Sequence, residues 1–562
     1  MKKRIIIFLL GIVALGISSC NDEALNLNDT EHMSDIAVWS TEEAADAYIT
    51  AVYKTFTDVS QVANSRNQYY DSYTDLMKST SWEMYGHPYN KALLQASSFV
   101  SGSAGSFDCW EDVYIRIRRA NVLLNDLNRY GTSYGEEWCN IRRAEIRLCR
   151  AFSYYRLARV YGGVVIRTDI SGVNGGTDDG LFPEDVNRKR ATEAETWDFI
   201  ISDLQWAAEK LPDFWSSKWE GRATKKTAYG LISRMALFAK KWQTAIDAAE
   251  KVKELGGALA NDYAKVFQVR GGQDNSSEIL FALNFLENSI THGYDSQNRP
   301  FGDQAVYTST TILAEHVPTA ELADMYEFSD GTEFNWNNYA ADHPDPYTDR
   351  EPRFHATIMY NGCQWEGRTI QSYEGGTDGF TDFKQVGSTS GHTCTGYYLR
   401  KYLQEGYSDF IVKGSYQYDA MLRYAEVLLN KAEAYAELDY SRYKTEALGA
   451  LNEVRNRVGL PEKDAATKDA FLTLLRKERC VELAGEGFRY WDLRRWKLAV
   501  NVINGQNVHG VKITKSGNSY SYEKVECDGG TPRIFLEKYY YFSLPKDELV
   551  NNKELGGNNP QW

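Results

Sequence analysis

The chain has 562 residues, of which 77 are acidic and 63 are basic, giving a net charge of −14 at neutral pH. This balance argues against nucleic acid as a partner, because phosphates attract clustered cations, and against docking on anionic lipid headgroups. Aromatic residues are the compositional outlier, with 38 Tyr and 14 Trp. Because these side chains present a flat apolar face with a polar tip, we expect part of the excess on the surface, where it suits protein interfaces and sugar rings alike.

The first residues follow the pattern of a secretory signal peptide. Three basic residues, Lys2 to Arg4, precede the apolar run Ile5–Ile17, which is too short for a spanning helix of about 20 residues. The run ends in Ile17-Ser18-Ser19-Cys20, which resembles the lipobox of bacterial lipoproteins. This resemblance implies cleavage after residue 19 and a lipid on Cys20; the alternative is an ordinary signal peptide with an incidental cysteine.

Cleavage at this point has two consequences for the mature chain. Residues 20–40 become a polar, lipidated tether, and the net charge falls to −17 because residues 1–19 contain three basic and no acidic side chains. No other window offers about 20 apolar residues, so we expect the lipid to be the only attachment to a membrane.

Helical segments, often in pairs, follow the tether. Thr41 has the character of an N-cap, and apolar residues recur at helical spacing in the ranges 41–56, 110–127, 139–161, 192–211, 224–240 and 242–255. The last two ranges together are about 34 residues long, which is the length of a tetratricopeptide unit. A similar pair is predicted over 418–438 and 443–458. We therefore expect a mainly α fold with a tetratricopeptide-like scaffold over about 41–257 and 418–500.

The stretch between these helices, about 258–417, is rich in Gly, Asn, Asp, Thr and aromatic residues. It predicts a long, irregular, loop-rich lobe with short β-hairpins. One hairpin is expected at Asn361-Gly362, which lies between two strand-like runs, and another around Ser516-Gly517-Asn518 in the C-terminal segment 501–562. Loops on a rigid scaffold are the usual place for binding residues, so the lobe is the first place to look for a ligand site.

Motifs that would indicate an enzyme are missing from the sequence. There is no H-E-x-x-H, G-x-S-x-G or Walker-type glycine loop, and the eight His lack metal-like spacing. The seven cysteines after Cys20 contain no C-x-x-C pair and are expected to be mostly buried thiols. Acidic residues are so numerous that nothing selects a glycosidase pair among them. We therefore expect a binding protein, with no catalysis, cofactor or metal site.

Several strings combine into a family resemblance. They include Arg119-Ala120-Asn121, Glu145 to Tyr155, Val160 to Val164, Asp349 to Phe354, Thr395-Gly396-Tyr397, Arg423 to Glu426 and, most specific, Glu478 to Trp496. The pattern resembles the SusD/RagB family of outer-membrane nutrient-uptake lipoproteins over essentially the whole chain. The charged members of these strings are expected to hold the fold together: Glu478 and Glu482 lie four apart on a helix, and Arg147 and Arg150 are predicted as buried ion-pair partners.

The resemblance implies a lipid-anchored protein of the outer membrane that faces the cell exterior. It also implies a partner, a SusC-like TonB-dependent transporter, to which captured oligosaccharide is delivered. In the RagB branch of the family the cargo is peptide, and this alternative stays open. A purely protein-binding helical-repeat scaffold is the other alternative.

A sugar ring offers an apolar C–H face and a rim of hydroxyls, so a site for it needs aromatic rings beside amides, carboxylates or arginines. Three loop stretches combine these residue types. The candidate glycan-binding residues are Trp82, Tyr85, Asn90, Tyr294, Arg299, Trp336 and Tyr339. Each aromatic residue among them has an alternative role in the core or at the transporter interface.

Overall fold

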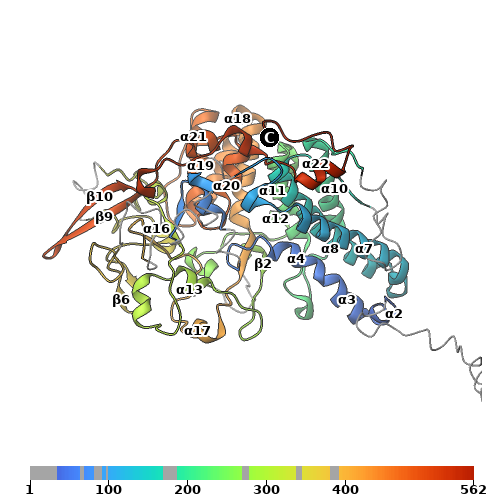
Figure 1. The fold of residues 1–562 in the computed structure, drawn as a ribbon, viewed down its shortest axis with the longest axis horizontal. Coiled ribbons are helices and arrows are strands. Elements are labelled where there is room, and N and C mark those ends of the chain that lie inside the picture. The colour runs from blue at the N-terminus through green and yellow to red at the C-terminus, as the bar shows by residue number, and fades with distance from the viewer. Residues whose placement is uncertain are drawn as a thin grey trace, which may run out of the picture.

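The computed structural model describes residues 35–63, 69–80, 92–95, 99–168, 187–268, 277–336, 345–379 and 392–562. Helices gather on one side of the molecule, and an irregular lobe of loops and short strands forms the other side (Figure 1). One cluster of buried apolar side chains runs through both parts, from Val38 to Leu555. The predicted mainly α fold with an irregular lobe is confirmed.

The first half of the chain forms the larger part of the helical side. Its helices are α2 (Asp35–Val38), α3 (Glu42–Thr50), α4 (Lys54–Thr57), α7 (Trp110–Tyr130), α8 (Glu136–Tyr161), α10 (Glu193–Lys210), α11 (Lys225–Phe238) and α12 (Trp242–Glu254). Thr41 caps α3 by accepting from the N–H of Ala44, and Thr192 and Glu195 form a capping box at α10. Gly162, with a φ of 77°, ends α8.

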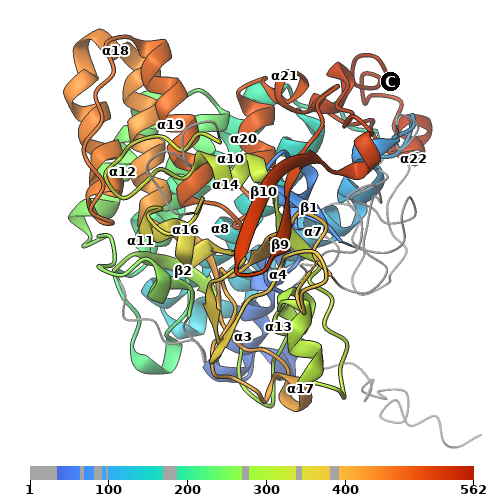
Figure 2. The same cartoon turned by 90° about the vertical axis from the view of Figure 1, so that its left-hand side faces the viewer.

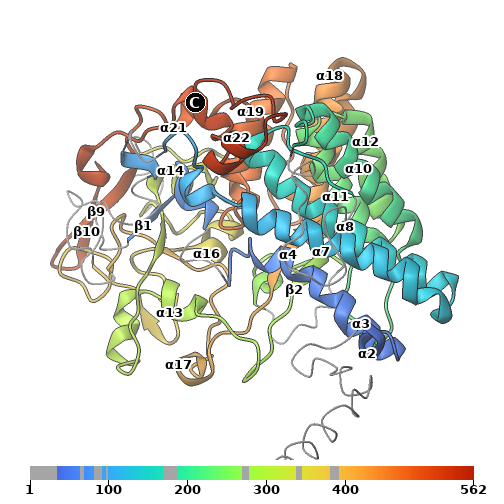
Figure 3. The ribbon, with the colours of Figure 1, turned by 45° about the vertical axis from the view of Figure 1, so that its right-hand side comes forward.

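Consecutive helices pack against each other in chain order. Helix α8 contacts both α7 and α10, α10 contacts α11, and α11 contacts α12, so these helices lie side by side in one layer (Figure 3). Small residues at the contacts of α11 and α12, among them Ala228 and Ala245, are fully buried and let the two helices approach closely. Arg147 and Arg150 on α8 both bind Asp203 on α10, which confirms their predicted ion-pair role.

The second half of the chain contributes helices to both the helical side and the lobe. Its helices are α13 (Tyr294–Asn298), α14 (Ala320–Met325), α16 (Pro352–Thr357), α17 (Phe410–Lys413), α18 (Tyr424–Asn456), α19 (Lys468–Glu482), α20 (Arg489–Arg495), α21 (Ala499–Ile503) and α22 (Lys546–Asn551). Helix α18 packs between α12 and α19, as Figure 2 shows. Non-helical dihedral angles at Asp439 and Tyr443 interrupt α18, where the sequence predicts the end of one helix and the start of the next.

The predicted start of that helix at residue 418 is wrong. Residues Asp419–Arg423 form strand β8, which pairs antiparallel with β2 (Ile279–Leu283), and α18 begins only at Tyr424. Both the strand and the first turns of the helix contain buried apolar residues, so the apolar pattern alone does not separate them.

Apart from the C-terminal hairpin, the described strands of the lobe are short, and each pairs with one other. These are β1 (Met77–Ser79) with β3 (His316–Pro318), β2 with β8, β4 (Ile358–Met359) with β7 (Tyr398–Leu399), and β5 (Gln364–Trp365) with β6 (Arg368–Thr369). The hairpin predicted at Asn361-Gly362 is wrong, because the flanking strands β4 and β5 do not pair with each other. The turn lies instead at Glu366-Gly367, where both residues have positive φ, as a tight hairpin turn requires.

The second predicted hairpin is confirmed. Strands β9 (His509–Ser516) and β10 (Ser519–Glu526) pair in register over all eight residues, with Gly517 at a φ of 61° in the turn. The hairpin extends from the lobe, with its tip away from the helical side (Figure 1). Most side chains of β10 are exposed.

A buried network of charged side chains joins the helical side to the lobe. Arg423 is about 1% exposed and binds the carboxylates of Glu278, Glu482 and Glu486 at 2.6–2.7 Å. Glu482 at the end of α19 also binds Arg353 of α16 at 3.0 Å, and these arginines hold its pKa well below the ordinary value against the effect of burial. The acidic residues of the family strings therefore have the structural role predicted for them.

Candidate ligand-binding regions

The residues predicted to bind ligand divide into two groups. Trp82, Tyr85, Asn90 and Tyr339 lie outside the described residues, as does the predicted lipidation site Cys20. Tyr294, Arg299 and Trp336 are described, and their surroundings differ.

Tyr294 lies on α13 in the interior of the lobe. Its side chain is fully buried, and its hydroxyl donates to the backbone oxygen of Lys401 at 3.1 Å. The ring meets that of Tyr402 edge to face at 6.0 Å between centroids. Burial raises the pKa of Tyr294. The side chain is part of the lobe core, so its position does not support direct contact with a ligand.

Arg299 follows α13 directly and is also fully buried. Its guanidinium binds both carboxylate oxygens of Glu366, at 2.7 and 3.0 Å, and donates to the backbone oxygen of Gln404 at 2.9 Å. It also lies over the ring of Phe410, 4.6 Å from the centroid. All these partners belong to the lobe itself. Arg299 holds three loops together, and its burial does not support a ligand contact either.

Trp336 is only half-buried and lies in a different part of the lobe. Its indole N–H donates to Asp324 of α14 at 2.9 Å, and its ring meets Phe334 edge to face at 5.2 Å. The other carboxylate oxygen of Asp324 binds Lys524 of β10 at 2.7 Å. These contacts fix the ring beside the β9–β10 hairpin, and a fixed, partly exposed indole can stack on the apolar face of a sugar.

Strand β10 brings a second aromatic pair to the same region. Tyr520, which is 39% exposed, packs on Tyr373 with 5.7 Å between ring centroids, and Lys515 of β9 lies 4.8 Å from the Tyr373 ring. Tyr520 and Lys524 are four residues apart on β10. Because side chains alternate between the two faces of a strand, both lie on the same face, about 13 Å apart along the strand. We call the surface formed by Trp336, Tyr373, Lys515 and Tyr520 the hairpin face.

The sequence analysis did not select the two tyrosines of the hairpin face. The alternation Ser519-Tyr520-Ser521-Tyr522 is a signal that could have found Tyr520, because alternate residues of an exposed strand share a face. Tyr373 had no such signal, since it lies in an irregular loop and meets β10 only in the folded chain.

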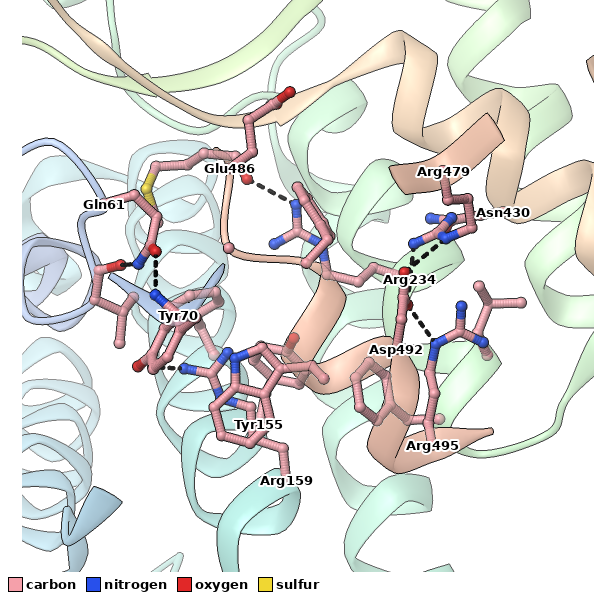
Figure 4. A pocket seen from close by; sticks show the side chains of 18 of the residues that line it. Gln61, Tyr70, Tyr155, Arg159, Arg234, Asn430, Arg479, Glu486, Asp492 and Arg495 are labelled. Carbon is pink, nitrogen blue, oxygen red and sulfur yellow. Dashed lines mark hydrogen bonds and ion pairs between the residues drawn. The ribbon is translucent and has the colours of Figure 1, made fainter. Parts of the chain in front are cut away.

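A polar cavity of about 60 Å³ lies in the helical side. Its wall contains charged residues of the family strings, including Asp492, which binds Arg479 and Arg495 at 2.8 Å each (Figure 4). Ligand pockets usually measure about 300–1,000 Å³, so this cavity has room for water molecules and not for a sugar ring. Its residues stabilise the packing of α20 on the scaffold.

Three further features belong to the described part of the chain alone. None of its helices combines the length and the apolar run that a bilayer crossing requires. The described residues also contain no group of three or more His, Cys, Asp or Glu side chains suited to a metal ion. Their seven cysteines are free thiols, six of them buried, in agreement with the sequence.

Comparison with known proteins identifies the family. The model of the SusD family matches residues 277–562, and a model described as starch-binding and associating with the outer membrane matches residues 25–237. A SusD-like protein of Formosa agariphila is 25% identical over 465 residues, which cover 81% of this chain and 80% of its own length.

Solved structures agree with this match. A SusD-like protein from Bacteroides fragilis is 26% identical, with a TM-score of 0.75 over 94% of this chain and 99% of its own. A laminarin-binding SusD-like protein has the same fold, with a TM-score of 0.64 at 21% identity over 93% of this chain and all of its own. Since the SusD family model alone matches more than half of the sequence, this chain belongs to the SusD family.

Proposed function

We propose that this protein is a cell-surface glycan-binding lipoprotein, anchored to the outer membrane by lipid on Cys20, that delivers oligosaccharides to a SusC-like TonB-dependent transporter. The family models support binding of glycan and association with the outer membrane. The laminarin-binding relative, which shares only the fold with this chain, makes β-glucan oligosaccharides the first ligands to test.

The observation that carries the proposal is the hairpin face. It combines the half-buried indole held by Asp324 with the exposed Tyr520, the half-buried Tyr373 and a lysine within one surface of the lobe. Aromatic faces bind the C–H side of sugar rings, and the carboxylate and the ammonium group are placed for hydroxyls. Lys524, which binds the same Asp324 as Trp336, lies about 13 Å along β10 from Tyr520, so an oligosaccharide of several residues could reach from one aromatic site toward the other.

Calorimetric titration of the mature protein with laminari-oligosaccharides tests the hairpin face. We expect Trp336→Ala and Tyr520→Ala each to weaken binding about tenfold, which corresponds to about 1.4 kcal/mol. Phe214→Ala is the matched control, because Phe214 is 82% exposed and lies on the α10–α11 connection. Unchanged affinity in both hairpin-face variants, with full binding by the wild type, would remove this surface from the ligand site.

The same titration extends to the residues that remain predictions. Trp82→Ala tests the loop stretch that contains Tyr85 and Asn90. A peptide pool in place of the oligosaccharides tests the RagB-like alternative, and absence of any small ligand would favour the pure protein-binding scaffold. Co-purification of the lipidated chain with a transporter barrel from outer membranes tests the partner, and a lack of product after long incubation with polysaccharides tests the expected absence of catalysis.

A further inference from the structure

A pocket of about 430 Å³ opens on the helical side. It lies between the end of α8, the first turn of α10, the end of α11, the α20–α21 turn and residues 540–541. Its volume is within the range of about 300–1,000 Å³ that is typical of ligand sites. Arg159, Phe238, Trp491 and Arg495 also line the 60 Å³ cavity, so this pocket lies directly outside that cavity.

The pocket is cationic, in a protein whose net charge is −14. Arg159, Lys240, Arg494 and Lys497 line it, and none of the four forms an ion pair with a carboxylate of the described residues. Arg494, for example, donates to the Tyr490 hydroxyl and to two backbone oxygens. A fifth cation of the wall, Arg495, is neutralised by Asp492 and Glu433.

One carboxylate, that of Glu193, accompanies these cations. It accepts from the hydroxyl of Tyr541 and, at 3.4 Å, from the indole N–H of Trp197. The wall thus leaves four positive charges against one negative charge, and such uncompensated charge in a concave site attracts anions.

Three buried donors on the pocket wall lack an acceptor. They are Nε of Arg159, Nε of Arg494 and Nε1 of Trp491, on side chains that are all more than nine-tenths buried. The indole N–H is the only polar group of Trp491, and the guanidinium groups of Arg159 and Arg494 lie 4.0 and 5.3 Å from the centroid of its ring. A buried donor without a partner costs about 1–3 kcal/mol, and a ligand rich in acceptor oxygens can remove that cost.

The remaining wall is aromatic. Trp197, Phe238, Tyr540 and Tyr541 line the pocket, and the ammonium group of Lys497 lies 4.3 Å from the ring centroid of Tyr540. Lys240 and Lys497 both have positive φ, 55° and 59°, a conformation that costs a non-glycine residue about 1 kcal/mol or more. Glycine usually occupies such positions after a helix, so two lysines there favour a role for their charges.

We propose that this pocket binds an acidic sugar residue, whose carboxylate or sulfate group contacts Arg494, Lys497 and Lys240, whose ring packs on the aromatic wall, and whose hydroxyls reach Glu193. The anion is argued from the pocket itself; only its attachment to a sugar rests on the proposed function. A second hollow of about 510 Å³, whose charged lining residues are Lys189, Arg190 and Glu554, shares Thr192 with the pocket and would continue the site toward the next residue of an acidic glycan.

The test titrates the full mature chain with glucuronate, galactose 6-sulfate and glucose in a calorimeter. We expect one or both acidic sugars to bind at least about tenfold more tightly than glucose, and the preferred one to distinguish carboxylate from sulfate. Added salt should weaken this binding, because exposed cations are screened. Glucose binding as tightly as both acids, or no saturation by either acid at millimolar concentrations, would overturn the proposal.

The variant Lys240→Gln/Lys497→Gln locates the binding. Both lysines are exposed, so we expect the helical circular dichroism to be unchanged while affinity for the acidic sugar falls about tenfold or more. Lys253→Gln, at an exposed position of α12, is the matched control and should bind as the wild type does. Equal affinity in the double variant and the control would place the binding elsewhere and end the proposal.

The two proposals fail independently. The double lysine variant should retain binding of neutral oligosaccharides, which depends on Trp336 and Tyr520. If neutral oligosaccharides bind no form of the protein while glucuronate binding is lost only in the double lysine variant, the hairpin-face proposal fails and the anion pocket stands.

Discussion

The helical side and the lobe share one core but are stabilised in different ways. On the helical side the described helices α7, α8, α10, α11 and α12 each pack against the next one in the chain. Caps such as Thr192 accept hydrogen bonds from backbone N–H groups at the helix ends. In the lobe the described strands other than the β9–β10 hairpin are two to five residues long, and β2 pairs with a strand about 140 residues later in the chain. Contacts between neighbouring segments of the chain therefore dominate the helical side, and contacts between distant segments dominate the lobe.

In the lobe, where backbone pairing between strands is short, buried arginines connect distant segments through ion pairs. Arg299, Arg353 and Arg423 are each at most about 1% exposed, and each binds carboxylates from other segments. Arg368 likewise joins Asp303 to Asp378 at 2.7–2.8 Å. Removing one partner of such a network leaves buried charge uncompensated, so we expect the irregular loops to depend on these side chains.

The largest expected effect is at the junction of the two regions. Arg423→Met leaves Glu278, Glu482 and Glu486 buried without their shared partner, and we expect a loss of about 3–5 kcal/mol in the free energy of unfolding. Urea denaturation followed by circular dichroism measures it. Lys251→Gln, which breaks an exposed ion pair with Glu254, is the control and should change little. A loss as small as that of the control would show that the network does not join the regions.

The pH dependence of stability tests a buried carboxylate at the same junction. Burial raises the pKa of Asp71 to about 7, although its carboxylate accepts from the N–H of Gly485 at 2.8 Å. The native state therefore holds a proton that the unfolded chain has released above about pH 4. Stability from this group is complete below pH 4 and is lost as the pH rises to about 7, by up to about 4 kcal/mol.

The variant Asp71→Asn lacks that linkage. Between pH 4 and pH 7 we expect the free energy of unfolding to fall further in the wild type than in the variant. Urea denaturation at each pH measures both values. Parallel pH profiles would contradict the assignment.

A smaller and local effect is expected inside the lobe. Arg299→Met removes the partner of Glu366 and should destabilise the surrounding loops by about 3 kcal/mol. Because the scaffold helices make their own contacts, we expect faster amide exchange in residues 294–305 and 402–407 with α8 and α11 still protected. Faster exchange throughout the chain would mean that the two regions unfold as one unit.

The smallest effects have opposite signs in the two regions. Gly517 has a φ of 61° in the hairpin turn, and a Cβ there meets no atom within 4 Å, so Gly517→Ala should cost about 1 kcal/mol through its conformation alone. Gly449 lies in α18, also with open space around it, and Gly449→Ala should stabilise by about 0.5–1 kcal/mol. Urea midpoints that move in the same direction would contradict this reasoning.

Much of the helical side could be predicted because its signals are local. The apolar spacing in 192–211 and the Thr192–Glu195 pair lie within one helix, and the structure has that helix one residue shorter at each end. The prediction failed at residue 418, where pairing of β8 with a distant strand overrides a helix-like apolar pattern. It failed again at Asn361-Gly362, because a turn signal does not say which strands will pair.

The candidate site was harder to predict than the fold. Tyr294 and Arg299 have the residue types of a sugar site, but the same types also suit a buried loop whose arginine meets carboxylates of its own chain. Trp336 is partly exposed and stays a predicted ligand contact, whereas Tyr373 became a partner of Tyr520 only through folding. Whether a polar group faces a ligand or its own protein depends on contacts that sequence spacing does not contain.

The sequence by itself determined the family, the helical scaffold with its irregular lobe, and the roles of the charged residues in the family strings. It could do so because caps, helical periodicity and family strings are each contained in a short stretch of chain. Only the tertiary structure decided which loop residues are buried, that the hairpin face assembles beside β10, and that uncompensated cations of α8, α11 and the α20–α21 turn share one pocket. These properties depend on segments hundreds of residues apart, brought together by burial of a common core.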